Sequence, residues 1–117
     1  LGRVKNILEL GTFTGYSALV MAEQLPEDGK VTTIDINPHT TEIAQSFWKR
    51  SPHGHKIELI LKPGTEALKD LPGNYDLIFI DADKRNYAHY LSWSLDHLSE
   101  RGVIVVDNTL WSGKVLD

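Results

Sequence analysis

The feature that most limits the fold of this chain is the regular alternation of short apolar segments with segments of helical periodicity. The apolar segments predict strands, at residues 4–10, 31–36, 57–61, 75–80 and 103–106. The segments between them predict helices, which begin at residues 16, 38, 65 and 87. Strands that alternate with helices of this length need right-handed crossovers and form a mostly parallel sheet. The sequence therefore predicts an α/β fold with a doubly wound sheet.

A strand order of 3-2-1-4-5 would place the first and fourth predicted strands side by side, at the switch point of the sheet. Ligands of such sheets bind outside the carboxyl ends of the strands. The same order leaves residues 103–106, Val-Ile-Val-Val, at an open edge, which is a pairing hazard that natural proteins avoid. We therefore expect further strands to cover this edge in a longer chain, and a start at Leu1 instead of Met agrees with that expectation.

Composition limits the class of protein. The chain has 117 residues, of which 41% are hydrophobic and 24% charged, as in an ordinary globular protein, and residues 1–117 are predicted to be one domain. A net charge of −4 mildly disfavours a nucleic-acid surface. The absence of cysteine excludes disulfides and thiolate metal sites. No apolar run approaches the roughly 20 residues that span a membrane, and no signal peptide is recognisable. We expect a cytoplasmic location.

The turn after the first predicted strand carries two glycines, Gly11 and Gly15, in the segment Glu-Leu-Gly-Thr-Phe-Thr-Gly. Glycine lets the backbone approach a ligand closely, although glycines in strand-to-helix turns are common and the signal is weak by itself. Asp35 at the end of the second strand strengthens it, because a carboxylate there can accept hydrogen bonds from both ribose hydroxyls. The G-x-x-x-G spacing is not that of dinucleotide binders, so the pattern favours a nucleoside without a pyrophosphate.

Acidic residues follow two other predicted strands. Asp81 comes directly after residues 75–80, and Asp107 and Asn108 come after residues 103–106. An aspartate at a strand end often only stabilises the next turn, and each position alone fits that structural role. In the predicted strand order, however, Asp81 lies at the end of one strand, and Asp107 and Asn108 lie at the end of the neighbouring strand. Carboxylate and amide oxygens suit a hard divalent cation, so their coincidence favours a metal site.

Lys84 lies close to this predicted metal site in the sequence. Near a divalent cation the ammonium form of a lysine is disfavoured, so Lys84 could act as a base near neutral pH. A salt bridge between Lys84 and Asp83 at the start of the next helix is the structural alternative. The position of Lys84 in the sequence fits both roles.

The histidines and two of the tryptophans receive structural assignments. The histidines show no metal-ligand spacing and are assigned to solvated surface: His39, His53, His55, His89 and His97. Trp48 follows Ala44 at the four-residue spacing of one helix face. We assign Trp48 and Trp93 to the core.

Four segments taken together resemble the cation-dependent O-methyltransferases, a family that includes catechol O-methyltransferase and caffeoyl-CoA O-methyltransferase. In chain order they are residues 8–17 (LELGTFTGYS), 34–38 (IDINP), 79–84 (FIDADK) and 107–113 (DNTLWSG). Each segment alone has low specificity, but the set is highly specific and covers nearly the whole chain, with the bacterial members most similar. The resemblance implies a Rossmann-like methyltransferase fold from which the N-terminal helices and last strands of the family are missing.

The resemblance also implies cofactors and site residues. The methyl donor would be S-adenosylmethionine, and the metal would be Mg²⁺, Mn²⁺ or Ca²⁺. The implied donor-binding positions are Glu9, Gly11, Thr12, Gly15, Ser17, Asp35, Ile36, Thr65 and Asp81, with Asp35 at the ribose and Thr65 near adenine. The implied metal ligands are Asp81, Asp107 and Asn108, and the implied catalytic residues are Asp81 and Lys84, with Lys84 as the base.

The acceptor implied by the resemblance is a small phenol with adjacent oxygens, of the catechol or hydroxycinnamoyl type, and the full-length protein would be a homodimer. Ser112 stands where the plant enzymes carry Asn, which argues against a plant-type acceptor. A family member that methylates hydroxyuridine in tRNA is an alternative that the acidic balance only mildly disfavours.

Two further alternatives lie outside methyl transfer. A nicotinamide oxidoreductase would share the fold but would need the G-x-G-x-x-G turn that this sequence lacks. A non-catalytic nucleoside-binding module of the same fold is the second alternative. The intact Asp81, Lys84, Asp107 and Asn108 weigh against degeneration of the site.

Overall fold

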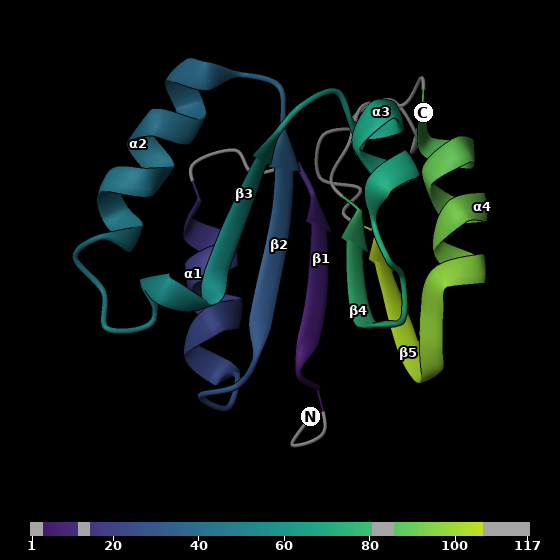
Figure 1. Ribbon diagram of the computed structural model, residues 1–117, viewed down its shortest axis with the longest axis horizontal. Coiled ribbons are helices and arrows are strands. Elements are labelled where there is room, and N and C mark those ends of the chain that lie inside the picture. The colour runs from purple at the N-terminus through teal and green to yellow at the C-terminus, as the bar shows by residue number, and fades with distance from the viewer. Residues whose placement is uncertain (1–3, 12–14, 81–85, 107–117) are drawn as a thin grey trace, which may run out of the picture.

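The computed structural model describes residues 4–11, 15–80 and 86–106. In this part of the chain, strands and helices alternate as Figure 1 shows. The elements are β1 (Asn6–Leu10), α1 (Tyr16–Gln24), β2 (Lys30–Asp35), α2 (Pro38–Trp48), η1 (Gly54–Lys56), β3 (Ile57–Leu61), α3 (Gly64–Ala67), η2 (Leu68–Asp70), β4 (Tyr75–Ile80), α4 (Tyr87–His97) and β5 (Leu98–Val106), where η marks a 3₁₀ helix.

The strands form one parallel sheet in the order β3-β2-β1-β4-β5, which confirms the predicted order. β1 lies between β2 and β4, and its last residue Leu10 is the register partner of both Ile34 and Ile80. The carboxyl ends of the strands therefore lie along one edge of the sheet, at the top of Figure 1. A parallel, doubly wound sheet binds its ligands at this edge.

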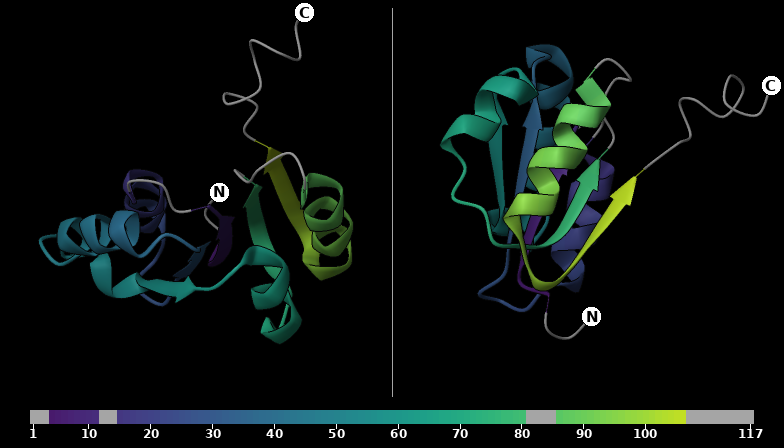
Figure 2. Two further views of the ribbon diagram at one scale, coloured as in Figure 1. Left: turned by 90° about the horizontal axis from the view of Figure 1, so that it is seen from above. Right: turned by 90° about the vertical axis from the view of Figure 1, so that its right-hand side faces the viewer.

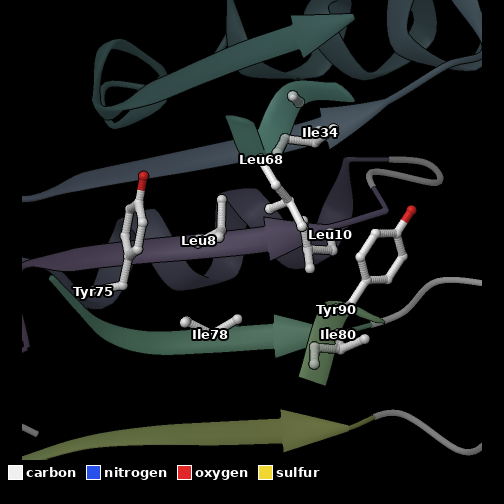
Figure 3. Packing of buried hydrophobic residues seen from close by; sticks show 9 residues of the cluster. Leu8, Leu10, Ile34, Leu68, Tyr75, Ile78, Ile80 and Tyr90 are labelled. Carbon is white, nitrogen blue, oxygen red and sulfur yellow. The ribbon is translucent and has the colours of Figure 1, made fainter. Parts of the chain in front are cut away.

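Helices cover both faces of the sheet (Figures 1 and 2). On the face covered by α3, η2 and α4, Leu8 and Leu10 of β1 lie in one apolar cluster with Leu68, Ile78 and other buried residues (Figure 3). On the opposite face, α1 and α2 pack over Ile7 of β1. The alternation of Ile7 and Leu8 between two clusters is what a strand buried on both faces requires.

Two predicted elements differ from the structure. The helix predicted at residues 65–71 is the short helix α3 followed by the 3₁₀ turn η2. β5 begins at Leu98 and not at Val103, because Leu98 already pairs with Tyr75, and an irregularity in register precedes the pair Leu77–Val103. The polar residues 99–101 hid this first part of the strand. Gly102 lets β5 approach β4 closely, since a Cβ atom there would lie 2.8 Å from the Tyr75 carbonyl oxygen.

The last four residues of β4 alternate between half-buried and buried positions. Ile78 and Ile80 are buried against α4, whereas Leu77 and Phe79 are only half-buried. On β5, the register partners of Leu77 and Phe79 are Val103 and Val105, which are 55% and 39% exposed. The described residues thus leave the face that α1 and α2 cover over β1–β3 largely uncovered over β4 and β5. Among the described residues, no helix combines the length and apolar composition needed to cross a membrane.

Candidate functional site

The turn that follows β1 is fastened to the end of β2. The Gly11 amide donates a 2.8 Å hydrogen bond to the Ile34 carbonyl oxygen, next to Asp35. Gly11 and Gly15 have φ angles of 109° and 82°, which disfavour any residue with a side chain. Gly15 is also the N-cap of α1, so the first turn of that helix starts from a left-handed backbone. The two predicted glycines are therefore required by backbone conformation at the carboxyl edge of the sheet.

Glu9 and Ser17, two predicted donor-binding residues, are hydrogen-bonded to each other through their side chains. Glu9 has no exposed surface, and its Oε1 atom also accepts a 2.7 Å hydrogen bond from the Thr33 hydroxyl. A buried carboxylate is costly unless its oxygens are paired with donors. The Glu9 carboxylate is thus held between β2 and the first turn of α1.

Asp35 ends β2, and its carboxylate is held by the turn that it begins. Its Oδ1 atom accepts hydrogen bonds from the amides of Ile36 at 2.7 Å and Asn37 at 3.2 Å. Asn37 then caps α2 by accepting from the amides of His39 and Thr40, with Pro38 as the first helical residue, as predicted. Next to Asp35, the Ile36 side chain is 64% exposed and offers an apolar surface.

The carboxyl end of α2 contacts Gly15, the last residue of the glycine turn. The Trp48 indole Nε1 donates a 3.0 Å hydrogen bond to the Gly15 carbonyl oxygen, and the indole is buried. A Cβ atom on Gly15 would overlap the Ala44 side chain. The assignment of Trp48 to the core is therefore correct in burial but incomplete, because the indole is also bonded to the predicted donor site.

Thr65 lies in the first turn of α3 and lines an open hollow of about 820 Å³ at the same edge of the sheet. The other lining residues are Pro63, Glu66, Lys69, Asn86 and His89. The hollow separates α3 from the start of α4.

The other predicted site residues, Thr12, Asp81, Lys84, Asp107 and Asn108, lie outside the described residues. The structure does describe the strand ends that precede the predicted metal ligands. Ile80 and Val106 are register partners on the neighbouring strands β4 and β5. Within residues 4–11, 15–80 and 86–106, no group of three or more histidine, aspartate or glutamate side chains could hold a metal ion.

A described carboxylate with a displaced pKa, Asp76, lies at the opposite end of the sheet. Burial by itself would raise the pKa of Asp76, but the Lys5 amide, the Ser99 hydroxyl and the Asn6 amide outweigh burial and hold the pKa below its usual value. The hydrogen bonds are 3.0 Å from each amide and 2.8 Å from the hydroxyl. Asp76 therefore ties the start of β1 and β5 to β4 and has a structural role.

The fold and the carboxyl edge define a Rossmann-like α/β domain, with a glycine turn after β1 and an acid at the end of β2. The chain belongs to the O-methyltransferase family, whose model matches residues 1–117. It is 42% identical over 118 residues to caffeoyl-CoA O-methyltransferase 2 of Petunia hybrida, an alignment that covers 96% of this chain and 49% of the plant protein. The chain thus spans about half the length of the curated relatives it matches.

Solved structures show the same fold. The O-methyltransferase TomG from Streptomyces achromogenes, in complex with SAM, has a TM-score of 0.89 and 34% identity, with 98% of this chain and 53% of TomG covered. An O-methyltransferase from Bacillus cereus in complex with SAH has a TM-score of 0.88 and 33% identity, with 97% of this chain and 54% of that protein covered. Both complexes support S-adenosylmethionine as the ligand class of this family.

Sequence reasoning missed two residues that hold the site together, Thr33 and Trp48. Thr33 lies between Thr32 and Ile34 in β2 and looks like an ordinary strand residue. Trp48 carried a partial signal, since its spacing from Ala44 placed both on one buried face. Their hydrogen-bond partners lie 24 and 33 residues away in the chain, so periodicity could not reveal them.

Proposed function

We propose that the complete protein is an S-adenosylmethionine-dependent, divalent-cation-dependent O-methyltransferase that acts on a phenol with adjacent hydroxyl groups. The acceptor class is a catechol or a hydroxycinnamoyl derivative. The observation that carries the proposal is the bond between Gly11 and the end of β2, which brings the glycine turn beside Asp35. This arrangement occurs in a chain of the O-methyltransferase family, and similar structures hold SAM or SAH.

The described residues suit the two ends of the donor. The Asp35 carboxylate would accept hydrogen bonds from the ribose hydroxyls, and the exposed Ile36 side chain would contact the adenine face. Thr65, at the edge of the hollow, would face adenine from α3. The turn between Gly11 and Gly15, with Thr12, would receive the methionine portion through backbone groups, with Ser17 and the buried Glu9 behind it.

The acceptor half of the proposal depends on residues after β4 and β5. Support comes from the register of Ile80 with Val106, because Asp81 and Asp107 directly follow these partners in the sequence. A divalent cation held by Asp81, Asp107 and Asn108 would supply Lewis acidity and lower the pKa of an acceptor hydroxyl. Lys84 would accept the proton of that hydroxyl.

The deprotonated acceptor oxygen would then attack the sulfonium methyl group in line. A phenolate and a sulfonium lose charge as they approach the transition state, so a site that excludes water favours the reaction. Alignment of the two reactants can supply roughly 7–11 kcal/mol in favourable systems. The rigid support of Asp35 and of the glycine turn by the sheet serves this alignment.

The test uses the full-length protein. Isothermal titration with S-adenosylmethionine, S-adenosylhomocysteine and NADH identifies the ligand class, and we expect binding of the first two only. A methylation screen of catechols, hydroxycinnamoyl thioesters and hydroxyuridine RNA, with and without Mg²⁺, then identifies the acceptor. If only the RNA is methylated, the acceptor is hydroxyuridine RNA and not a phenol. Donor binding without turnover on any acceptor would favour a non-catalytic module.

Two variants test the metal and base roles. Asp107→Ala should abolish metal-dependent turnover, and a chelator should do the same to the wild-type enzyme. Undiminished methylation after chelation would remove the cation from the proposal. Lys84→Met should lower turnover while donor binding is retained, and a normal rate in this variant would exclude Lys84 as the base.

A further inference from the structure

The Trp48 side chain joins two helices at the point where the donor is proposed to bind. Its indole nitrogen donates a 3.0 Å hydrogen bond to the Gly15 carbonyl oxygen. The same oxygen accepts the Leu19 amide at 3.1 Å, which is the first hydrogen bond of α1. The orientation of the Gly15 peptide therefore depends on a side chain from α2 as well as on its own helix.

The packing around Gly15 leaves this peptide little freedom. A Cβ atom at Gly15 would overlap Ala44 and would lie 3.0 Å from the Trp48 Nε1 atom. The indole is only 6% exposed and lies in the apolar cluster with Ala18 and Ala22 of α1, which have no exposed surface. These small residues let α2 come close enough for the indole to reach the Gly15 carbonyl.

A buried indole N–H needs an acceptor, and many backbone carbonyls could serve that purpose. Here the acceptor belongs to the residue that ends the glycine turn and begins α1. The opposite end of α2 begins at the turn that holds Asp35. One helix thus contacts the proposed ribose site at its first turn and the proposed methionine site at its last turn.

We propose that Trp48 is a positioning residue for the methyl donor. It holds the Gly15 peptide, and with it the first-turn amides of α1, in the orientation that receives the methionine portion. This inference rests on the proposed function. Without the indole N–H, the Gly15 peptide would occupy the binding-competent orientation for a smaller fraction of the time. The apparent Kd then rises in inverse proportion to that fraction.

The test compares Trp48→Phe with the wild type in the full-length protein by isothermal titration with two ligands. S-adenosylhomocysteine carries the amino-acid portion, and 5′-methylthioadenosine lacks it. Loss of one hydrogen bond corresponds to an increase in Kd of about threefold to tenfold. We expect Trp48→Phe to lower the affinity for S-adenosylhomocysteine by this factor. Its affinity for 5′-methylthioadenosine should stay within about twofold of the wild-type value.

Trp93→Phe is the matched control, because Trp93 lies in α4, which packs on the other face of the sheet, and stacks on His97 with ring centroids 3.8 Å apart. It should leave both affinities unchanged. A parallel loss of both ligands in Trp48→Phe would assign Trp48 a purely structural role and overturn the inference, as would an unchanged affinity for S-adenosylhomocysteine.

A second variant covers the case in which Trp48→Phe does not fold. Benzothienylalanine at position 48 keeps the size of the indole and replaces its N–H by sulfur, so the packing is retained and the donor is lost. This variant should lower the affinity for S-adenosylhomocysteine and leave that for 5′-methylthioadenosine unchanged. An affinity for S-adenosylhomocysteine equal to that of the wild type would overturn the inference. Absence of S-adenosylhomocysteine binding in the wild type would instead overturn the proposed function itself, and this inference with it.

Discussion

The Thr33 hydroxyl donates a 2.7 Å hydrogen bond to the Glu9 carboxylate, and neither side chain has any exposed surface. The two residues are register partners on the neighbouring strands β2 and β1, so their side chains leave the sheet on the same face. Ser17 of α1 is bonded to the same carboxylate. The buried carboxyl group of Glu9 thus holds the first turn of α1 to the sheet, at the proposed methionine end of the donor site.

Thr33→Val tests this bond with little change in volume. We expect it to lower the free energy of unfolding by about 1–3 kcal/mol, because the buried Glu9 carboxylate loses a donor. Urea denaturation measures the difference. Thr32→Val is the control, since Thr32 is also buried but alternates to the opposite face of the sheet, and it should cost less. Equal costs for the two variants would show that the Glu9 bond contributes nothing specific.

Gly15→Ala should be strongly destabilising for two reasons. The φ of 82° is unfavourable for alanine by about 1–2 kcal/mol, and the new methyl group would overlap Ala44. Chemical denaturation should show a loss larger than the backbone cost alone. In the double variant Gly15→Ala/Ala44→Gly the overlap is relieved, so the two losses should sum to more than the loss in the double variant. Strict additivity would contradict the close contact.

Lys56→Met tests a buried ammonium group at the end of α1. The Lys56 side chain is 4% exposed, and its Nζ atom donates to the carbonyl oxygens of Leu25 at 2.9 Å and Ala22 at 3.2 Å. These carbonyls lie at the carboxyl end of α1, where a helix needs external donors. We expect a loss of about 1–3 kcal/mol in chemical denaturation. Lys49→Met, at an exposed position, should be nearly neutral.

Asp76→Asn should change how stability depends on pH. Because the pKa of Asp76 is lowered in the folded state, its ionised form stabilises the fold above the unfolded-state pKa of about 3.9, and this contribution is lost as the pH falls through the folded pKa. At pH 7 the variant should therefore be less stable than the wild type. Below about pH 4 the two stabilities should converge.

Thermal denaturation in a series of buffers between neutral and acidic pH measures this difference. Asp96→Asn, on an exposed position of α4, is the matched substitution and should stay within about 0.5 kcal/mol of the wild type at pH 7. A gap between Asp76→Asn and the wild type that stays constant down to low pH would contradict a role for the charge of Asp76.

Much of the fold could be predicted because its signals are local. The bounds of β3 and β4 and the Asn37 cap of α2 follow from apolar runs and capping chemistry, and the strand order follows from the rules for parallel sheets. The first half of β5 could not be predicted, because residues 99–101 are polar and enter the sheet through pairing that starts at Tyr75. Tertiary pairing there outweighed the local pattern.

The candidate site also contains residues with a local sequence signal and contacts without one. Gly11, Gly15 and Asp35 could be found from the sequence, because each follows directly from its place at the end of a strand or the start of a helix. The bonds from Thr33 to Glu9 and from Trp48 to Gly15 could not, because they depend on how closely two elements pack. The donor-binding roles of Gly11, Gly15 and Asp35 stay predictions, as do the roles of Asp81, Lys84, Asp107 and Asn108.

The sheet is shielded from water unequally on its two sides. Among the described residues, β1 and β2 are buried on both faces, whereas Val103 and Val105 of β5 are exposed on the face that α1 and α2 cover elsewhere. Backbone amides in β4 and β5 should therefore exchange hydrogen for deuterium sooner than those in β1 and β2. In this 117-residue chain, the glycine turn and Asp35 would then follow the strands that exchange more slowly, and Asp81 and Asp107 the strands that exchange sooner.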